Sequence, residues 1–381
     1  MKVIICEYHP WKSDFRIGNH HYARMFLDRG WDVLWISHPV SFVHGLKSEN
    51  RERMELARRG PVRHPGGPTE LVPYTYLPFL NAPVLSSTWV LENSRRFFSP
   101  SLRGSLGKAG FDKPDLLWIT DTVMHAIVDT ADAKALAVRI ADDNIEFAGI
   151  PKSLRAVEKR LVRRADAVFA TSLPLQKRFE AMGGARVHLL RNGVDFDHFQ
   201  GEFEKPGEYE GIAGPIAIYM GAMDHWFAVE WVESLATRRP DITLVLIGRE
   251  GIDLAPLNLF PNVRVLGRRL YEEIPRYLAY ASVGIIPFRR TRLVESISPL
   301  KLFEFLAAGL PVVSTRWSEL EFLAGPALLA SDGEEFVRLV SRVVDEDWKG
   351  EQGDHFRRFA KENSWQARFD GAMSVLARYL E

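Results

Sequence analysis

Residues 295–315 read ESISPLKLFEFLAAGLPVVST, a loop followed by a helix, a stop and a strand. Ser298 suits the N-cap of that helix, and Pro299 suits its first position. Gly309 and Pro311 then end the helix, since glycine favours the left-handed turn after a helix and proline cannot continue one. A helix joined by a short turn to an apolar, β-branched strand is the repeating unit of an α/β domain.

Apolar runs of the same kind alternate with helical segments along most of the chain. Residues 205–215 interrupt this pattern with a stretch rich in Gly, Pro and Glu, which reads as a linker. Before the linker we expect strands at 2–6, 32–37, 116–119, 136–141, 166–170 and 187–190. After it we expect strands at 216–221, 243–248, 263–267, 283–287 and 311–315. The pattern predicts two doubly wound α/β domains in tandem.

The chain length agrees with this division, because 381 residues exceed the usual domain length of about 100 to 200 residues. We expect an N-terminal Rossmann-like domain over 1–204, a C-terminal Rossmann-like domain over 205–352, and closing helices over 353–381. In open α/β sheets, ligands bind beyond the carboxyl ends of the strands. Two such domains facing each other would therefore form a cleft, and function should be sought in the loops that follow the strands.

Composition excludes several classes of protein. Lys and Arg total 49, as do Asp and Glu, so no excess of positive charge indicates a nucleic-acid partner. Cys6 is the only cysteine, which excludes an intrachain disulfide and suits a reducing compartment. No apolar run approaches the roughly 18 residues that span a bilayer. We expect a cytoplasmic protein whose membrane association is peripheral, on the inner face of the plasma membrane.

Familiar catalytic and nucleotide-binding motifs are missing. The first strand is not followed by GxGxxG, and GxxxxGK[ST], HExxH and GxSxG do not occur. Their absence removes the dinucleotide-binding, P-loop, zincin and α/β-hydrolase interpretations.

Two charged residues stand in the otherwise apolar helix. Lys301 lies in its first turn, where a cation costs about 0.3 to 1 kcal/mol unless an anion also binds there. Free amides plus a lysine at a helix start form a cradle for a diphosphate. Glu304 shares the face of Lys301 and could accept hydrogen bonds from ribose hydroxyls. The alternative is an ion pair between them on a solvated face, worth roughly 0.2 to 0.5 kcal/mol.

This helix and two further motifs resemble a known family. SPLKLFEFLAAGLPVVST, the NGVD turn at 192–195 and YMGAM at 219–223 occur in the order found in GT-B glycosyltransferases, especially bacterial enzymes of family 4. The resemblance spans nearly the whole chain. It implies an acceptor-binding N-terminal domain and a C-terminal domain that binds a nucleotide sugar, with Glu304 on the ribose and Lys301 on the diphosphate.

The donor-site candidates combine this resemblance with position in the fold. Arg249 and Arg268 follow the strands 243–248 and 263–267, so they are expected at carboxyl ends of strands. The complete set is Gly221, Met223, Arg249, Arg268, Ser298, Leu300, Lys301 and Glu304. Arg289, Arg290 and Arg292 precede the helix and could bind an acidic sugar, although a solvated loop is the alternative. The family's E-x7-E pattern is broken, because Ser296 stands where the first Glu would fall and Glu295 is one residue away.

A second resemblance concerns the acceptor side. LAVRIADDNIEF at 136–147 is similar to the N-terminal active-site segment of the membrane-associated glucuronosyltransferase of xanthan synthesis, which implies that Asp142 is the base of an inverting reaction. Adjacent side chains usually point different ways, so either Asp142 or Asp143 is expected to face the acceptor. For both, the alternative is an Asx turn or a helix cap. His21, near Arg16 and His20, is a third catalytic candidate, although most histidines are structural.

Basic residues mixed with apolar ones occupy 95–113, RRFFSPSLRGSLGKAGFDK, and a second basic stretch occupies 152–166. The first mixture is expected of an amphipathic anchor on anionic lipid. Either stretch is alternatively a charged helix face.

The sequence therefore predicts a glycosyltransferase that moves a sugar from a UDP-sugar to an acceptor hydroxyl in glycan, polysaccharide or glycolipid assembly. The acceptor is expected to be a glycan or lipid-linked. No metal cofactor is expected, because a helix terminus and Lys301 can offset the charge of the leaving group. Alternatives are a nucleotide-sugar epimerase on the same scaffold and a non-catalytic GT-B subunit that stabilises a partner enzyme.

Overall fold

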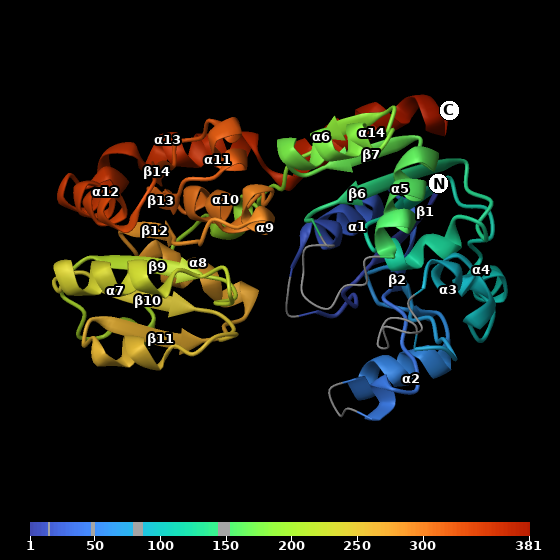
Figure 1. Ribbon diagram of the computed structural model, residues 1–381, viewed down its shortest axis with the longest axis horizontal. Coiled ribbons are helices and arrows are strands. Elements are labelled where there is room, and N and C mark those ends of the chain that lie inside the picture. Colours follow the sequence, from blue (N-terminus) through green and yellow to red (C-terminus); the bar gives the residue numbers. More distant parts are fainter. Residues whose placement is uncertain (14–15, 47–49, 79–86, 144–152) are drawn as a thin grey trace. The chain divides into compact units, whose positions relative to one another are not determined.

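The computed structural model describes residues 1–13, 16–46, 50–78, 87–143 and 153–381, and they form two compact units (Figure 1). The N-terminal unit comprises 1–191 and 369–381, and the C-terminal unit comprises 192–368. The division thus falls at Arg191/Asn192 rather than at 204/205, because Val194 and Phe199 already belong to the core of the C-terminal unit. The helices expected to close the structure are shared between the units.

The N-terminal unit is built on a sheet of eight strands among the described residues, in the order β3-β4-β2-β1-β5-β6-β7-β8. All neighbours are parallel except β3 and β4. The strands are β1 Lys2–Glu7, β2 Asp32–Ser37, β3 Val62–Arg63, β4 Thr69–Leu71, β5 Leu116–Ile119, β6 Ala135–Ile140, β7 Ala167–Ala170 and β8 Val187–Leu189. Its α-helices are α1 Gly18–Asp28, α2 Arg51–Arg59, α3 Thr88–Glu92, α4 Leu102–Ala109, α5 Leu154–Arg164, α6 Leu173–Ala181 and the greater part of α14 Trp365–Leu380. Short 3₁₀ helices are η1 His44–Leu46, η4 Ser94–Phe97 and η5 Thr122–Ile127.

The C-terminal unit has a parallel sheet in the order β11-β10-β9-β12-β13-β14. The strands are β9 Ile216–Met220, β10 Thr243–Ile247, β11 Val263–Gly267, β12 Val283–Ile286, β13 Val312–Thr315 and β14 Leu328–Ala330. The helices are α7 Val229–Arg238, α8 Ile274–Ala279, α9 Arg292–Glu295, α10 Leu300–Ala307, α11 Ser318–Leu323, α12 Gly333–Asp345 and α13 Trp348–Glu362. Short 3₁₀ helices are η7 Asp197–Phe199, η8 Gly207–Tyr209, η9 Ala255–Leu259 and η10 Tyr271–Glu273.

Both sheets are doubly wound, as predicted. In each, the chain first builds outward in one direction and then returns to add strands on the other side, so the order reverses between β1 and β5 and between β9 and β12. Ligands of such sheets bind beside this reversal, at the carboxyl ends of the strands. The predicted strands are confirmed within a residue or two, and β3, β4 and β14 were missed.

Helix α14 carries the chain back into the N-terminal unit. Phe369 is fully buried, and its ring centroid lies 4.8 Å from that of Phe26 on α1. Tyr22, also on α1, packs against the same ring. Arg29 forms an ion pair with Asp370. These contacts make residues 369–381 part of the N-terminal core rather than a separate closing element.

The prediction that apolar residues of 95–113 anchor the chain in lipid is wrong. Phe98, Leu102, Leu106 and Phe111 are buried in the core of the N-terminal unit, because α4 turns its apolar face inward. The leucines and valines of the second basic stretch, which includes α5, are also buried. Lys152 of that stretch lies outside the described residues. Of the helices that the structure describes, none combines the length and the apolar character needed to cross a membrane.

Candidate active site

Helix α10 begins one residue later than predicted. Its N-cap is Pro299, without a side-chain cap, and Leu300 is the first helical residue and is half-buried. Ser298 is therefore not the N-cap. Its carbonyl oxygen accepts a 2.7 Å hydrogen bond from Nδ2 of Asn192, and its hydroxyl lies 3.4 Å from the Asn192 amide. This pair holds the NGVD turn against the loop that starts the helix.

Lys301 lies over two aromatic rings in the first turn of α10. Its Nζ is 4.8 Å from the ring centroid of Tyr219 and 4.4 Å from that of Phe288, and 3.4 Å from the Tyr219 hydroxyl. Burial lowers the pKa of Lys301 to about 7. In the part of the chain that the structure describes, its ammonium forms no ion pair with a carboxylate, so the alternative of a solvated pair with Glu304 is wrong. An anion at this place would supply the missing partner.

Glu304 lies one turn further along the same helix. Burial raises the pKa of its carboxyl to about 7, and Lys301 opposes that rise. The carboxylate accepts no hydrogen bond from another described side chain, although Glu304 is half-buried. Its oxygens are therefore available to a ligand that donates two hydrogen bonds, as vicinal ribose hydroxyls do.

Gly221 lies beside Lys301, and Gly248 packs against the backbone of Gly221. Gly221, at the end of β9, has a φ of +126°, and a β-carbon there would lie 2.9 Å from Nζ of Lys301. Gly248, at the end of β10, has a φ of +150°, and a β-carbon there would lie 1.8 Å from the carbonyl oxygen of Gly221. The backbone can therefore approach a ligand closely where Lys301 ends. Met223 is different, because its side chain is fully buried and only its backbone follows this loop.

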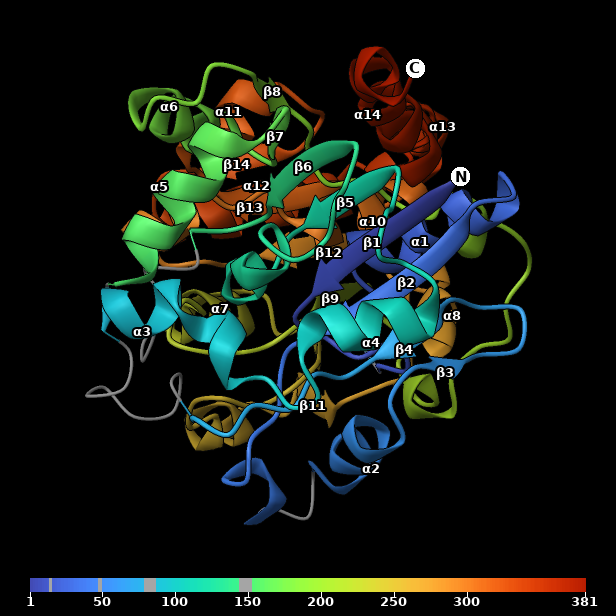
Figure 2. The ribbon, with the colours of Figure 1, turned by 90° about the vertical axis from the view of Figure 1, so that its right-hand side faces the viewer.

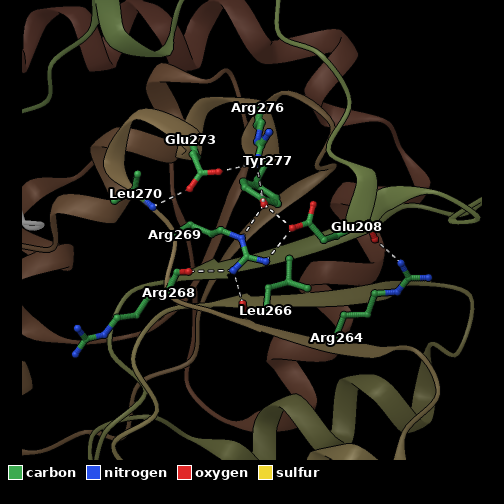
Figure 3. A network of polar contacts seen from close by, with 9 residues as sticks. All are labelled: Glu208, Arg264, Leu266, Arg268, Arg269, Leu270, Glu273, Arg276 and Tyr277. Carbon is green, nitrogen blue, oxygen red and sulfur yellow. Dashed lines mark hydrogen bonds and ion pairs between the residues drawn. The ribbon is translucent and has the colours of Figure 1, made fainter.

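Two arginines were predicted to line the donor site after strands of the C-terminal unit. Among the described residues, neither forms a hydrogen bond or ion pair with Lys301 or Glu304. Arg249 forms an ion pair of 2.9 Å with Asp224. Arg268 is exposed, and Figure 3 shows its side chain pointing away from the polar network around its neighbour Arg269.

Residues 205–215, predicted as a linker, belong to the C-terminal unit, and Arg269 fastens them to the rest of it. Arg269 donates to the Tyr277 hydroxyl at 2.8 Å and to Glu208 at 2.8 Å (Figure 3). The Tyr277 hydroxyl also donates to Glu208, at 3.0 Å. The predicted linker is thus fastened to β11 and α8.

The arginines before α10 are largely occupied. Arg289 pairs with Glu230 at 2.7 Å, and Arg290 pairs with Glu295 at 3.0 Å. The other oxygen of Glu295 accepts from the amide of Ser318 at 2.9 Å. Ser296 is buried and donates to the Leu293 carbonyl, so this position supplies no carboxylate.

The two adjacent aspartates after β6 differ sharply. Asp143 is buried and pairs with Arg178, which also pairs with Glu158 at 2.7 Å. Asp142 is half-buried and makes no hydrogen bond or ion pair with any described residue. Burial raises its carboxyl pKa, Arg139 opposes this, and Asp143 adds to it. Asp142 is thus the available carboxylate. Residues 144–147 of the resembling segment lie outside the described residues.

Of the two histidines on α1, His20 is structural in character. His20 is buried, its Nε2 lies 3.2 Å from the Pro10 carbonyl oxygen, and its ring stacks on Trp11. Burial lowers its pKa to about 4. His21 is half-buried on the same helix, and Arg16 before it is exposed.

Sequence reasoning missed a polar group on the N-terminal sheet. Nδ1 of His38, directly after β2, lies 2.6 Å from Oδ2 of Asp121, which follows β5. The Asp121 Oδ1 accepts from the Val123 amide at 3.0 Å. Strands β2, β1, β5 and β6 are neighbours (Figure 2), so His38, Asp121 and Asp142 follow carboxyl ends at one edge of the sheet. The available signal was a polar residue within two positions of the end of each strand.

No three His, Cys, Asp or Glu side chains gather as metal ligands in the ranges that the structure describes.

Known proteins resemble both halves of the chain. Residues 214–346 match the family model described as glycosyl transferases group 1, and residues 4–171 match the N-terminal domain of glucuronosyltransferase GumK. The putative teichuronic acid biosynthesis glycosyltransferase TuaH of Bacillus subtilis (strain 168) is 26% identical over 231 residues. That match covers 57% of this chain and 58% of the relative.

Solved structures share the fold along the whole chain. Sucrose-phosphate synthase from Thermosynechococcus elongatus has a TM-score of 0.74 and 15% identity, covering 100% of this chain and 99% of that one. Anabaena HepE in complex with UDP has a TM-score of 0.67 and 16% identity, covering 99% and 100%. The solved structures confirm the predicted fold, and the family models and the B. subtilis relative support the predicted glycosyltransferase class.

Proposed function

We propose that this chain is a GT-B glycosyltransferase that transfers a sugar from a UDP-sugar to a hydroxyl of a glycan or lipid-linked acceptor in polysaccharide assembly. The observation that carries the proposal is the amino group of Lys301, drawn over two aromatic rings without a carboxylate partner among the described residues. HepE was solved with UDP and with UDP-glucose, which supports a uridine donor. The name of the B. subtilis relative supports a polysaccharide product.

The donor residues have separate tasks in this proposal. The diphosphate lies at the start of α10, where Lys301 and the free amides of the first turn offset its charge. Glu304 accepts from the ribose hydroxyls. Gly221 keeps the space beside Lys301 free of a side chain. No metal enters the proposal, because the leaving diphosphate gains its stabilisation from these groups as charge develops.

Asp142 is proposed as the base. The bond between the sugar C1 and the diphosphate oxygen breaks with its electron pair remaining on UDP. The acceptor oxygen forms the new bond to C1 and gives its proton to the Asp142 carboxylate. Support comes from the availability of this carboxylate and from its raised pKa, which suits proton abstraction near neutral pH. A base on the acceptor side of the sugar implies inversion.

A thermal-shift screen tests the donor assignment. A ligand present at 100 times its dissociation constant stabilises a protein by about 2.7 kcal/mol, so UDP and UDP-sugars should raise the melting temperature. Lys301→Ala should abolish that rise. If no uridine nucleotide stabilises the wild-type chain, the assignment fails. Release of UDP together with a lengthened acceptor separates transfer from epimerisation, and turnover by the purified chain separates an enzyme from a non-catalytic subunit.

The proposal includes association with the anionic inner face of the plasma membrane through the N-terminal unit. Arg95, Arg96 and Arg103 are exposed there. Phe98 and Leu102, which lie between them in the chain, are in the core, so the attraction proposed is electrostatic rather than an insertion of side chains into lipid.

A further inference from the structure

Arg53, on α2, is a cation that lacks a full set of partners. Its Nη2 donates a 2.6 Å hydrogen bond to the carbonyl oxygen of His38. Its Nε is buried and has no hydrogen-bond partner. Burial lowers the pKa of the guanidinium. No carboxylate forms an ion pair with Arg53 in the part of the N-terminal unit that the structure describes.

The nearest carboxylates are committed to other donors. Asp121 and Glu70 both lie near enough to raise the pKa of Arg53. Asp121 is held by Nδ1 of His38 and by a backbone amide. Glu70 accepts from the Trp11 amide and the Ser37 hydroxyl, each at 2.9 Å, and its other oxygen lies 2.7 Å from Nε2 of His64. Asp121 and Glu70 therefore interact with Arg53 through their charge, but neither accepts a hydrogen bond from it.

The surroundings of Arg53 suit a sugar-bearing ligand. Tyr8 follows β1, is 56% exposed and lies with its ring centroid 4.7 Å from that of His38. The charge of Tyr8 raises the pKa of Arg53. The pKa of His9, the neighbour of Tyr8 in the chain, is lowered mainly by burial and further by the charge of Arg53. These residues follow β1 and β2, beside the point where the strand order reverses, which is where ligands of this kind of sheet bind.

We propose that Arg53 binds a singly charged oxyanion of the acceptor, a sugar carboxylate or a phosphodiester. A guanidinium presents its donors as a fork that matches the oxygens of such a group, and Nη1 of Arg53 is neither buried nor hydrogen-bonded to another described residue. Asp121 and Glu70 oppose a dianion more strongly than a monoanion, which disfavours a phosphate monoester. That the anion belongs to the acceptor rests on the proposed function. The existence of the site does not.

The test follows the Nε–H resonance of Arg53 in full-length protein labelled with ¹⁵N-arginine, assigned by its loss in Arg53→Lys. The probes are methyl glucuronide, the neutral methyl glucoside and dibutyl phosphate. We expect saturable shifts with one or both anions and none with the glucoside. A shift with the glucuronide alone assigns the site to a carboxylate, and one with dibutyl phosphate alone assigns it to a phosphodiester. If neither anion shifts the resonance, or if the neutral glucoside shifts it as much as the anions do, the site is overturned.

Two variants complete the test. Arg53→Gln should weaken anion binding by about tenfold or more, measured by calorimetry, because a charge-assisted pair is lost. Arg59→Gln is the matched control, since Arg59 is exposed on the same helix and pairs with Glu55, and it should leave binding unchanged. UDP binding is measured in parallel on each variant. Retained UDP binding with no anion binding by the wild-type chain would overturn the Arg53 site while leaving the proposed function standing.

Discussion

Gly248 and Gly221 approach each other so closely that a β-carbon on Gly248 would lie 1.8 Å from the carbonyl oxygen of Gly221. The ends of β9 and β10 are thereby held together at the place where Lys301 reaches over the backbone. The contact couples the stability of the C-terminal unit to the shape of the proposed donor site.

Gly248→Ala should destabilise the protein by about 3 kcal/mol or more, because the β-carbon overlaps backbone and the φ of +150° is unfavourable for alanine. Urea denaturation measures the loss. Gly207→Ala is the matched control, since a β-carbon at this exposed position meets nothing within 4 Å, and it should change stability by less than about 0.5 kcal/mol. Equal stability of both variants would contradict the overlap.

Affinity for UDP-glucose should pass through a maximum near pH 7. The bound diphosphate favours protonated Lys301, so binding raises that pKa from about 7 and affinity falls as pH rises above it. Ribose hydroxyls favour ionised Glu304, so binding lowers that pKa from about 7 and affinity falls as pH drops below it. Calorimetry between about pH 6 and pH 8 measures both limbs.

Variants separate the two limbs. Lys301→Met should weaken binding about tenfold or more and remove the alkaline limb, whereas Glu304→Gln should remove the acid limb. Lys361→Met, at an exposed lysine on α13, should leave the profile unchanged. An unaltered profile in both site variants would place the donor elsewhere.

Asp142→Asn should lower turnover by about 10² to 10⁴ while donor affinity stays constant. The reaction should also slow as pH falls through the raised pKa of Asp142, because only the carboxylate accepts a proton. Stability should be unchanged or increased, since burial disfavours the charge that the variant removes. Asp143→Asn is the comparison, and loss of its contact to Arg178 should cost about 1 to 3 kcal/mol. Full turnover in Asp142→Asn would end its assignment as base.

Sedimentation with anionic vesicles should recover the protein at low salt and release it at high salt. Reversing the charges of Arg95, Arg96 and Arg103 should reduce recovery, since each basic residue near the surface contributes about 1 kcal/mol. Because Phe98 and Leu102 are buried, we expect no recovery with neutral vesicles. Equal recovery with both kinds of vesicle would contradict an electrostatic attachment.

The parallel strands could be predicted because helices cover both faces, which makes runs such as IAIYM apolar throughout. The three missed strands have only two or three residues, too few to show a pattern. Lys301 and Glu304 could be chosen as donor-site candidates from the sequence because two charges in an apolar helix are unusual.

Other parts of the site depend on contacts that local sequence does not contain. His38 and Asp121 are 83 residues apart and meet only because β1 separates β2 from β5. The choice between Asp142 and Asp143 rests on Arg178, which lies 35 residues beyond Asp143. The apolar residues of 95–113 matched a lipid anchor and a core helix equally well, and only the packing of α4 distinguishes them.

The return of α14 makes the C-terminal unit an insertion within the N-terminal one. Residues 1–191 and 369–381 form one folded body although 192–368 stand between them in the chain. A single proteolytic cut between 192 and 204 would therefore not free the two halves, since Phe369 and Asp370 of the second fragment would still be held by Phe26 and Arg29 of the first. Producing the N-terminal body alone requires a direct fusion of residue 191 to residue 369.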